Sequence, residues 1–150
     1  MKLSQLFSHW KQVRDDLLST IDKFDDEELT FVPFESSMSA GQIMLHIGDA
    51  EEGWFRYVVS RVLEEWPDYD LEAYPTTEAI KDQLITVHTR TEKFLESLGL
   101  NDLERIIDMP KRDYRLSLGW IIWHVLEHEI HHRGELSLIL GMFGRAGLDV

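Results

Sequence analysis

The segment "HVLEHEIHHRGE", residues 124–135, holds four of the seven histidines of this 150-residue chain. They are His124, His128, His131 and His132, and three of the four follow one another at intervals of four residues. Residues three or four apart lie on the same face of an α-helix, because the helix turns once in about 3.6 residues. We therefore expect a helix here, with its imidazoles gathered along one side.

Three further segments have apolar residues at the same helical spacing, approximately residues 3–24, 39–63 and 76–98, and the histidine segment extends from about residue 117 to 144. Residues suited to N-caps stand at the expected starts: Ser4, Ser39 with Gln42, Thr76 or Thr77, and Ser117. We find no convincing strand. The sequence predicts an all-α four-helix bundle that spans residues 1–150 as a single domain. Its long loops suggest an order other than simple up-down-up-down.

Composition excludes several kinds of chemistry. The chain has no cysteine, so any thiol must come from a cofactor or substrate. Its formal net charge is −13, with 28 acidic and 15 basic residues, and "PKRDYR" at 110–115 is its longest basic patch. Such a surface repels nucleic acids and anionic lipids, so we expect neither as a partner. Without a signal-peptide pattern or a membrane-spanning apolar run, we expect a cytoplasmic protein.

The histidine stripe also contains Ile121 and Val125, so it faces partly inward. An unpaired polar group in the interior costs about 2–7 kcal/mol, so these imidazoles need partners. Hydrogen bonds within the cluster would supply them, but so many histidines at i, i+4 spacing favour a metal site. A third ligand should come from a facing helix. His46, in the apolar stretch "QIMLHIGDAEEGWF", is a better candidate than His9 or His88.

Two motif tests argue against familiar metalloenzyme classes. "HEIHH" at 128–132 matches the H-E-x-x-H pattern of zinc peptidases, but no histidine or glutamate follows Glu135 as a further ligand. A di-iron bundle needs two Glu-x-x-His motifs, and only Glu129 with His132 supplies one.

A histidine early in the second helix, together with "HxxxHxxxHRGE" in the last helix of an acidic bundle, resembles the DinB/YfiT-like family of proposed metalloenzymes. The resemblance covers nearly the whole chain. It implies a homodimeric four-helix bundle in which His46, His128 and His132 bind a divalent metal such as nickel or zinc. It also implies, as one activity of the family, S-transfer with a low-molecular-weight thiol. The chain departs from the family pattern at Glu135, where glutamine is usual.

Three functions remain open at this stage: a metal-dependent transferase or hydrolase acting on a small molecule, a non-catalytic metal-binding or stress-associated protein, and a metal-free interaction module. For the first, Glu129 and Glu135 are candidates for proton transfer or for orienting a ligand imidazole. Spacing alone does not choose between the pair His124 and His128 and the pair His128 and His132. His131 is rotated by about 100° from His132 and should not share its ion.

Overall fold

The computed structural model describes residues 1–148. It has four main helices: α2 (His9–Ile21), α3 (Ala40–Glu52), α4 (Thr77–Ser97) and α5 (Leu118–Met142). Smaller elements complete the fold: α1 (Leu3–Leu6), the 3-10 helices η1 (Asp26–Thr30) and η3 (Leu100–Glu104), the π-helix η2 (Gly53–Val59), and the strands β1 (Ile106–Asp108) and β2 (Arg115–Ser117). The predicted four-helix bundle is confirmed, with a small hairpin added.

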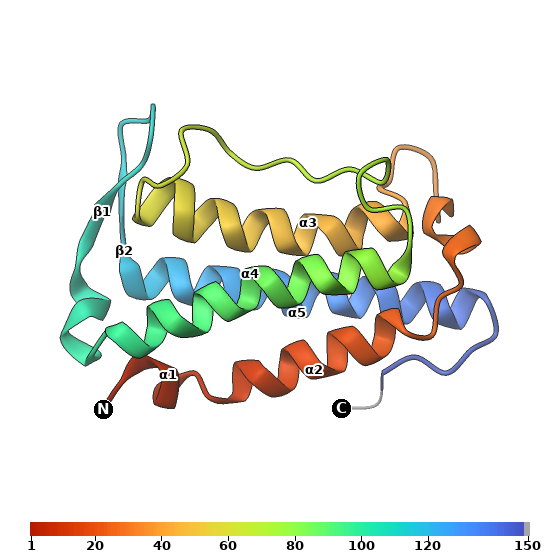
Figure 1. The fold of residues 1–150 in the computed structure, drawn as a ribbon, viewed down its shortest axis with the longest axis horizontal. Helices are drawn as coiled ribbons and strands as arrows, with labels where there is room; N and C mark the ends of the chain where they lie inside the picture. The colour runs from red at the N-terminus through yellow and green to blue at the C-terminus, as the bar shows by residue number, and fades with distance from the viewer. Residues whose placement is uncertain (149–150) are drawn as a thin grey trace.

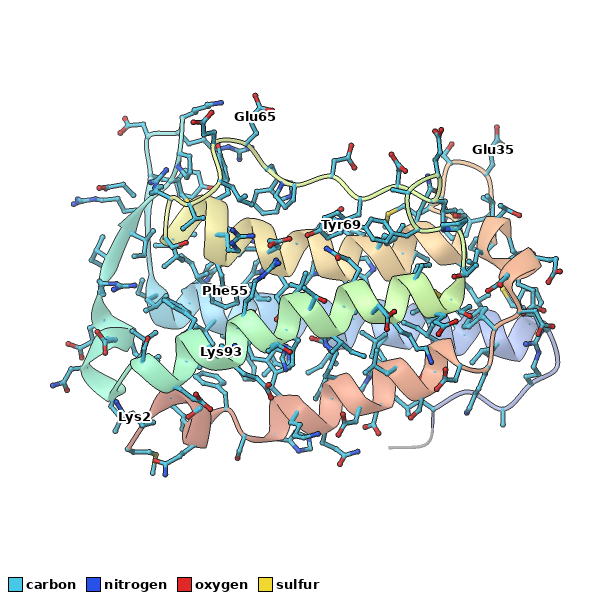
Figure 2. The ribbon with its side chains drawn as sticks, in the orientation of Figure 1. Lys2, Glu35, Phe55, Glu65, Tyr69 and Lys93 are labelled. Carbon is cyan, nitrogen blue, oxygen red and sulfur yellow. The ribbon has the colours of Figure 1, made fainter. Side chains whose placement is uncertain are left out.

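The order of the helices is not up-down-up-down. In Figure 1, α2 and α5 run in one direction, whereas α3 and α4 both run in the other. The two parallel helices α3 and α4 are joined by residues 60–76, which cross back along the outside of the bundle (Figure 1). Tyr69 of this crossover lies over α3 (Figure 2), where its ring passes 3.6 Å from the place of a Cβ on Gly48. The long loops of the sequence thus include a true crossover.

Three of the expected N-caps are present. Ser39 Oγ accepts a hydrogen bond from Gln42 N at 3.3 Å, and Gln42 Oε1 accepts one from Ser39 N at 2.8 Å, which completes a capping box. Thr76 caps α4 and Ser117 caps α5, each by accepting a backbone N–H three residues on. These caps satisfy N–H groups that have no partner inside the helix.

The prediction that Ser4 caps one long first helix is wrong. The helix begins at Leu3 after Lys2, is interrupted at Phe7 and Ser8, and resumes as α2. Leu3 N donates to Leu98 O at 3.0 Å, and Lys2 pairs with Gly99, so the start of the chain is held against the end of α4. This tertiary contact, rather than a local cap, determines where the first helix starts.

The prediction of no strands is also wrong. β1 and β2 pair antiparallel with Ile107 opposite Leu116, and β2 leads directly into α5. Each strand has three residues, too short to show the alternation by which strands are recognised in a sequence. No helix within residues 1–148 is both long and apolar enough to cross a membrane.

The interior consists of two apolar clusters. One contains Leu17, Ile47, Leu84 and Leu136, and the other contains Val13, Phe55, Leu95 and Leu126. Each main helix also carries a buried polar side chain, and along the sequence it lies between a residue of one cluster and a residue of the other. These side chains are Arg14, Glu51, His88, Glu129 and His132. The bundle is therefore apolar toward both ends with a polar layer across its middle, which is where the histidine segment lies.

Candidate metal centre

Three histidines from two helices converge between α3 and α5. His46 comes from α3, and His128 and His132 come from successive turns of α5. One potential ligand atom from each lies within 4.8 Å of the other two, and the Nε2 atoms of His46 and His128 are 3.1 Å apart. Two imidazole nitrogens bound to one tetrahedral zinc ion at about 2.0–2.1 Å would be about 3.3 Å apart. The side chains therefore have a spacing that suits a shared ion.

The local structure explains this convergence. The Ser39–Gln42 capping box sets the start and direction of α3, and His46 follows in its second turn. On α5, the i, i+4 spacing places His128 and His132 one above the other on the side that faces His46. The ring centroid of His46 lies 4.7 Å from that of His128 and 5.1 Å from that of His132. Both imidazoles of α5 therefore contact the imidazole of His46 on α3.

Two carboxylates orient two of the three imidazoles. His46 Nδ1 is 3.1 Å from Asp49 Oδ1, and His132 Nδ1 is 2.6 Å from Glu135 Oε2. A proton held on Nδ1 by a carboxylate leaves the Nε2 lone pair available, as is usual for metal-bound histidine. Both pairs have the form His-x-Gly-acid, "HIGD" at 46–49 and "HRGE" at 132–135. The sequence analysis did not include Asp49 in the site, although its i, i+3 spacing from His46 was a signal for it.

The surroundings shift the pKa of each clustered histidine. The hydrogen bond from His46 to Asp49 raises the pKa of His46 above its usual range. Burial, reinforced by repulsion from His132 and His46, lowers the pKa of His128 to about 3. Burial also lowers the pKa of His132, although Glu135 opposes that change. His128 and His132 are thus neutral at pH 7, which is the protonation state that metal binding requires.

The other two histidines of the segment lie outside this trio. His124 stacks on Trp120 with ring centroids 4.7 Å apart, and its ring is 6.3 Å from that of His128. His131 forms a second potential ligand group with His132 and Glu135, on a more exposed side of α5. Among the described residues, neither His9 nor His88 belongs to a group of this kind.

Glu129 points into a different part of the polar layer. Its Oε2 accepts hydrogen bonds from Trp10 Nε1 at 2.7 Å and from Arg14 Nη2 at 2.9 Å. Arg14 also binds Glu51, whose Oε1 is 2.8 Å from His88 Nδ1. This buried network joins all four main helices, and sequence reasoning missed it because each member looks ordinary within its own helix.

Glu51 is ionised within this network. Burial alone would raise the pKa of Glu51, but the charge of Arg14 and the hydrogen bond from His88 outweigh burial and lower it to about 2. Two buried atoms of this network, Arg14 Nε and Glu129 Oε1, have no hydrogen-bond partner among the described residues. The network is thus held by a guanidinium between two carboxylates, and its role in the geometry is to join helices rather than to face the histidine trio.

A cavity of about 470 Å³ adjoins Glu135. Ile43 of α3, Leu138 of α5 and Phe34 of the preceding loop contribute to its mostly apolar lining. Glu135 both borders this space and binds His132, so it connects the cavity to the trio, although no imidazole of the trio lines the cavity. The volume is typical of sites for small ligands.

These features define a class of protein: a helical bundle with a three-histidine cluster between its second and fourth main helices. The family profile of the DinB superfamily matches residues 9–136, and the chain belongs to that superfamily. It is also 27% identical over 149 residues to the uncharacterized protein YjoA of Bacillus subtilis strain 168, covering 97% of this chain and 93% of that protein.

Solved structures share the fold. A DinB-like protein from Bacillus cereus ATCC 10987 superimposes with a TM-score of 0.79 at 21% identity, over 96% of this chain and 94% of that one. The DinB-like YjoA structure from Bacillus subtilis gives 0.73 at 22% identity, over 97% and 96%. At such low identity the superpositions establish the fold alone and leave the chemistry to be argued from the side chains.

Proposed function

We infer that the protein is a metal-dependent enzyme that holds a divalent ion, zinc or nickel, through His46, His128 and His132. The carrying observation is the convergence of three imidazoles from two helices with potential ligand atoms within 4.8 Å. Three protein ligands with a further position open is the usual composition of a catalytic zinc site. A bound ion would supply a Lewis acid that lowers the pKa of a water or thiol on it.

We assign the reaction to transfer or hydrolysis on a small molecule, with a low-molecular-weight thiol as the co-substrate of a transferase. The absence of cysteine means that a thiolate must come from outside the chain. The cavity beside Glu135 offers an apolar surface to a substrate, and Glu135 connects that cavity to the trio through His132. Glu135, 41% exposed, orients His132 and is placed to exchange a proton with a molecule in that cavity. We assign Glu129 a positioning role, because both of its donors belong to α2.

A non-catalytic metal-binding protein is the second candidate. The trio joins α3 to α5 inside the polar layer, so a bound ion would also connect two helices, as a structural site does. The two candidates differ in the cavity at Glu135, which a purely structural ion does not need. The first proposal includes a homodimer, which is tested by measuring the mass of the protein in solution by sedimentation.

The test is metal content per chain, measured by elemental analysis on protein purified without an affinity tag. We expect about one ion per chain for the parent, and severe loss in His46→Ala, His128→Ala and His132→Ala, because a three-ligand site has no ligand to spare. His124→Ala is the matched control on the same helix face and should keep the parental content. Full retention in His46→Ala, or complete loss in His124→Ala, would overturn the assignment.

Catalysis needs its own measurement. The metal-loaded parent should conjugate a small thiol to an electrophile faster than protein stripped by a chelator. Glu135→Gln restores the residue usual in the family, so it should retain metal while its pH–rate profile shifts. Metal bound at full stoichiometry without any thiol-dependent or hydrolytic activity over a broad substrate screen would favour the non-catalytic candidate.

A further inference from the structure

We propose that a second cavity, between η2 and the tip of the β1–β2 hairpin, binds a small planar aromatic anion. It measures about 480 Å³, a size typical of small-molecule sites. Figure 1 shows the hairpin at the end of the bundle where α3 and η2 finish and the crossover begins. Aromatic side chains line it from three separate segments: Trp54 and Tyr57 of η2, Trp66 of the crossover and Tyr114 of the hairpin.

The aromatic wall is held in place by close packing. A Cβ on Gly53 would lie 2.5 Å from Trp66 Cε2, so only glycine lets this indole rest directly on the helix backbone. Trp66 in turn meets Trp54 at 84° and Tyr57 at 77°, with ring centroids 5.9 and 6.1 Å apart. These edge-to-face contacts fix the ring orientations. Trp66 nevertheless remains 41% exposed, so part of its ring is available to a ligand.

The backbone on this side is unusual as well. Residues Gly53–Val59 form a π-helix, a rare conformation that occurs often at functional sites. On the opposite wall, Lys111 at the hairpin tip has a φ of 59°, in the left-handed region that side chains other than glycine seldom adopt. The turn is closed by the hydrogen bond from Met109 N to Tyr114 O at 3.1 Å. Both walls of the cavity therefore have defined shapes.

The charge of the lining identifies the ligand. Lys111 and Arg112 both line the cavity, and neither forms an ion pair within the described chain. No acidic side chain among residues 1–148 lines it, although the protein has 28 aspartates and glutamates. Asp108 and Asp113 line an adjoining space on the other side of the hairpin tip, whose lining also includes Arg112 and Tyr114. The basic segment 110–115, which has no role in the proposed metal chemistry, thus contributes two of its three cations to an aromatic cavity.

Aromatic walls with two unpaired cations suit one chemical class. Indole and phenol rings stack on a flat ring or meet its edge, and lysine or arginine attracts a carboxylate, sulfonate or phosphate on that ring. A nonaromatic anion would lack the ring contacts, and a neutral ring would lack the charge contacts. Glu65 of the adjacent crossover points outward from the bundle (Figure 2) and does not line the cavity. The inference does not depend on a metal at the histidine trio.

The probe for the experiment is 2-naphthalenesulfonate, because a sulfonate is a poor metal ligand and the compound fluoresces. Binding is measured by calorimetry on chelator-treated protein, beside the neutral 2-naphthylmethanol and the nonaromatic methanesulfonate. We expect saturable one-to-one binding of the sulfonate, at least about tenfold tighter than either comparison compound, and weakened by salt.

Two variants test the location. Lys111→Gln with Arg112→Gln should weaken sulfonate binding about tenfold and leave the neutral ring unaffected, since two exposed charges are lost without disturbing the core. The matched control is Lys2→Gln with Lys93→Gln, two exposed lysines remote in the sequence (labelled in Figure 2), which changes the net charge equally and should preserve binding. Trp66→Leu should weaken the sulfonate and the neutral ring together.

The proposal is overturned by any of three results: no saturable binding of the sulfonate, equal binding of the neutral ring, or unchanged affinity in the Lys111→Gln, Arg112→Gln protein. If Leu138→Ser weakened sulfonate binding and Trp66→Leu did not, the naphthalene ring would lie in the cavity at Glu135. That result would overturn the proposal as well. None of these results changes the metal content of the protein, so the fate of the proposed metal centre is measured separately.

Discussion

Replacing Arg14 by methionine tests the polar layer that crosses the middle of the bundle. The side chain is 3% exposed and binds both Glu51 and Glu129, so the substitution leaves two buried carboxylates without their cation. Removing one partner of a buried ion pair costs about 3–5 kcal/mol. For a chain of this size, about 2–4 °C of melting temperature is lost per kcal/mol, so we expect a decrease of about 10 °C.

The assay is equilibrium unfolding by heat and by urea, followed by circular dichroism. The control is Lys11→Met on the same helix, which removes an exposed cation 2.8 Å from Asp15 and should change the transition very little. Adding Glu129→Met to Arg14→Met should recover part of the loss, because one unpaired charge is then removed.

The pH dependence of this variant has a definite sign. In the parent, the pKa of Glu51 is lowered to about 2, so the stability it contributes is present above about pH 4.5 and is lost as the pH falls toward 2. Without Arg14, burial should dominate and raise the pKa of Glu51 above that of the unfolded chain, so the variant should gain stability as the pH falls from 7 toward 5. A loss of less than about 1 kcal/mol, or an unchanged pH slope, would refute this account of the network.

Three further predictions concern the metal centre and the packing. Asp49→Asn removes the carboxylate that holds the proton on His46, so metal affinity measured by competition with a chelator should fall about 10- to 100-fold with the fold intact; unchanged affinity would contradict the orienting role. In metal-free protein, the pKa of His128 is about 3 in the folded state, below its value in the unfolded chain, so stability should decline as the pH falls below about 6.5. His128→Gln should reduce the dependence of the unfolding free energy on pH between about pH 6.5 and 5, measured by urea titrations. Gly53→Ala should destabilise the protein by about 1–3 kcal/mol, because its Cβ would clash with Trp66. The control is Gly141→Ala, whose Cβ would have nothing within 4 Å and which should stabilise α5 slightly. Equal melting temperatures for the two variants would show that the indole of Trp66 moves aside freely.

Much of this protein could be predicted from short-range patterns. Apolar residues at helical spacing identified the four main helices, and Ser39, Thr76 and Ser117 marked three of their starts, because a cap and its helix are neighbours in the chain. The i, i+4 spacing of His128 and His132 likewise depends only on the geometry of one helix. His46 was chosen as the partner on the sequence pattern and the family resemblance, and the structure brings it to 3.1 Å from His128.

What the sequence by itself determined was therefore the content of each helix and the face on which its histidines lie. Only the tertiary structure decided which faces meet, since that depends on contacts between residues far apart in the chain. The crossover that makes α3 and α4 parallel and the link from Arg14 to Glu51 and Glu129 are of this kind. So is the cavity that the hairpin's cations line together with Trp54 of η2 and Trp66 of the crossover. A periodic pattern reports that a side chain faces inward, and the partner it finds there is settled by the packing of the whole bundle.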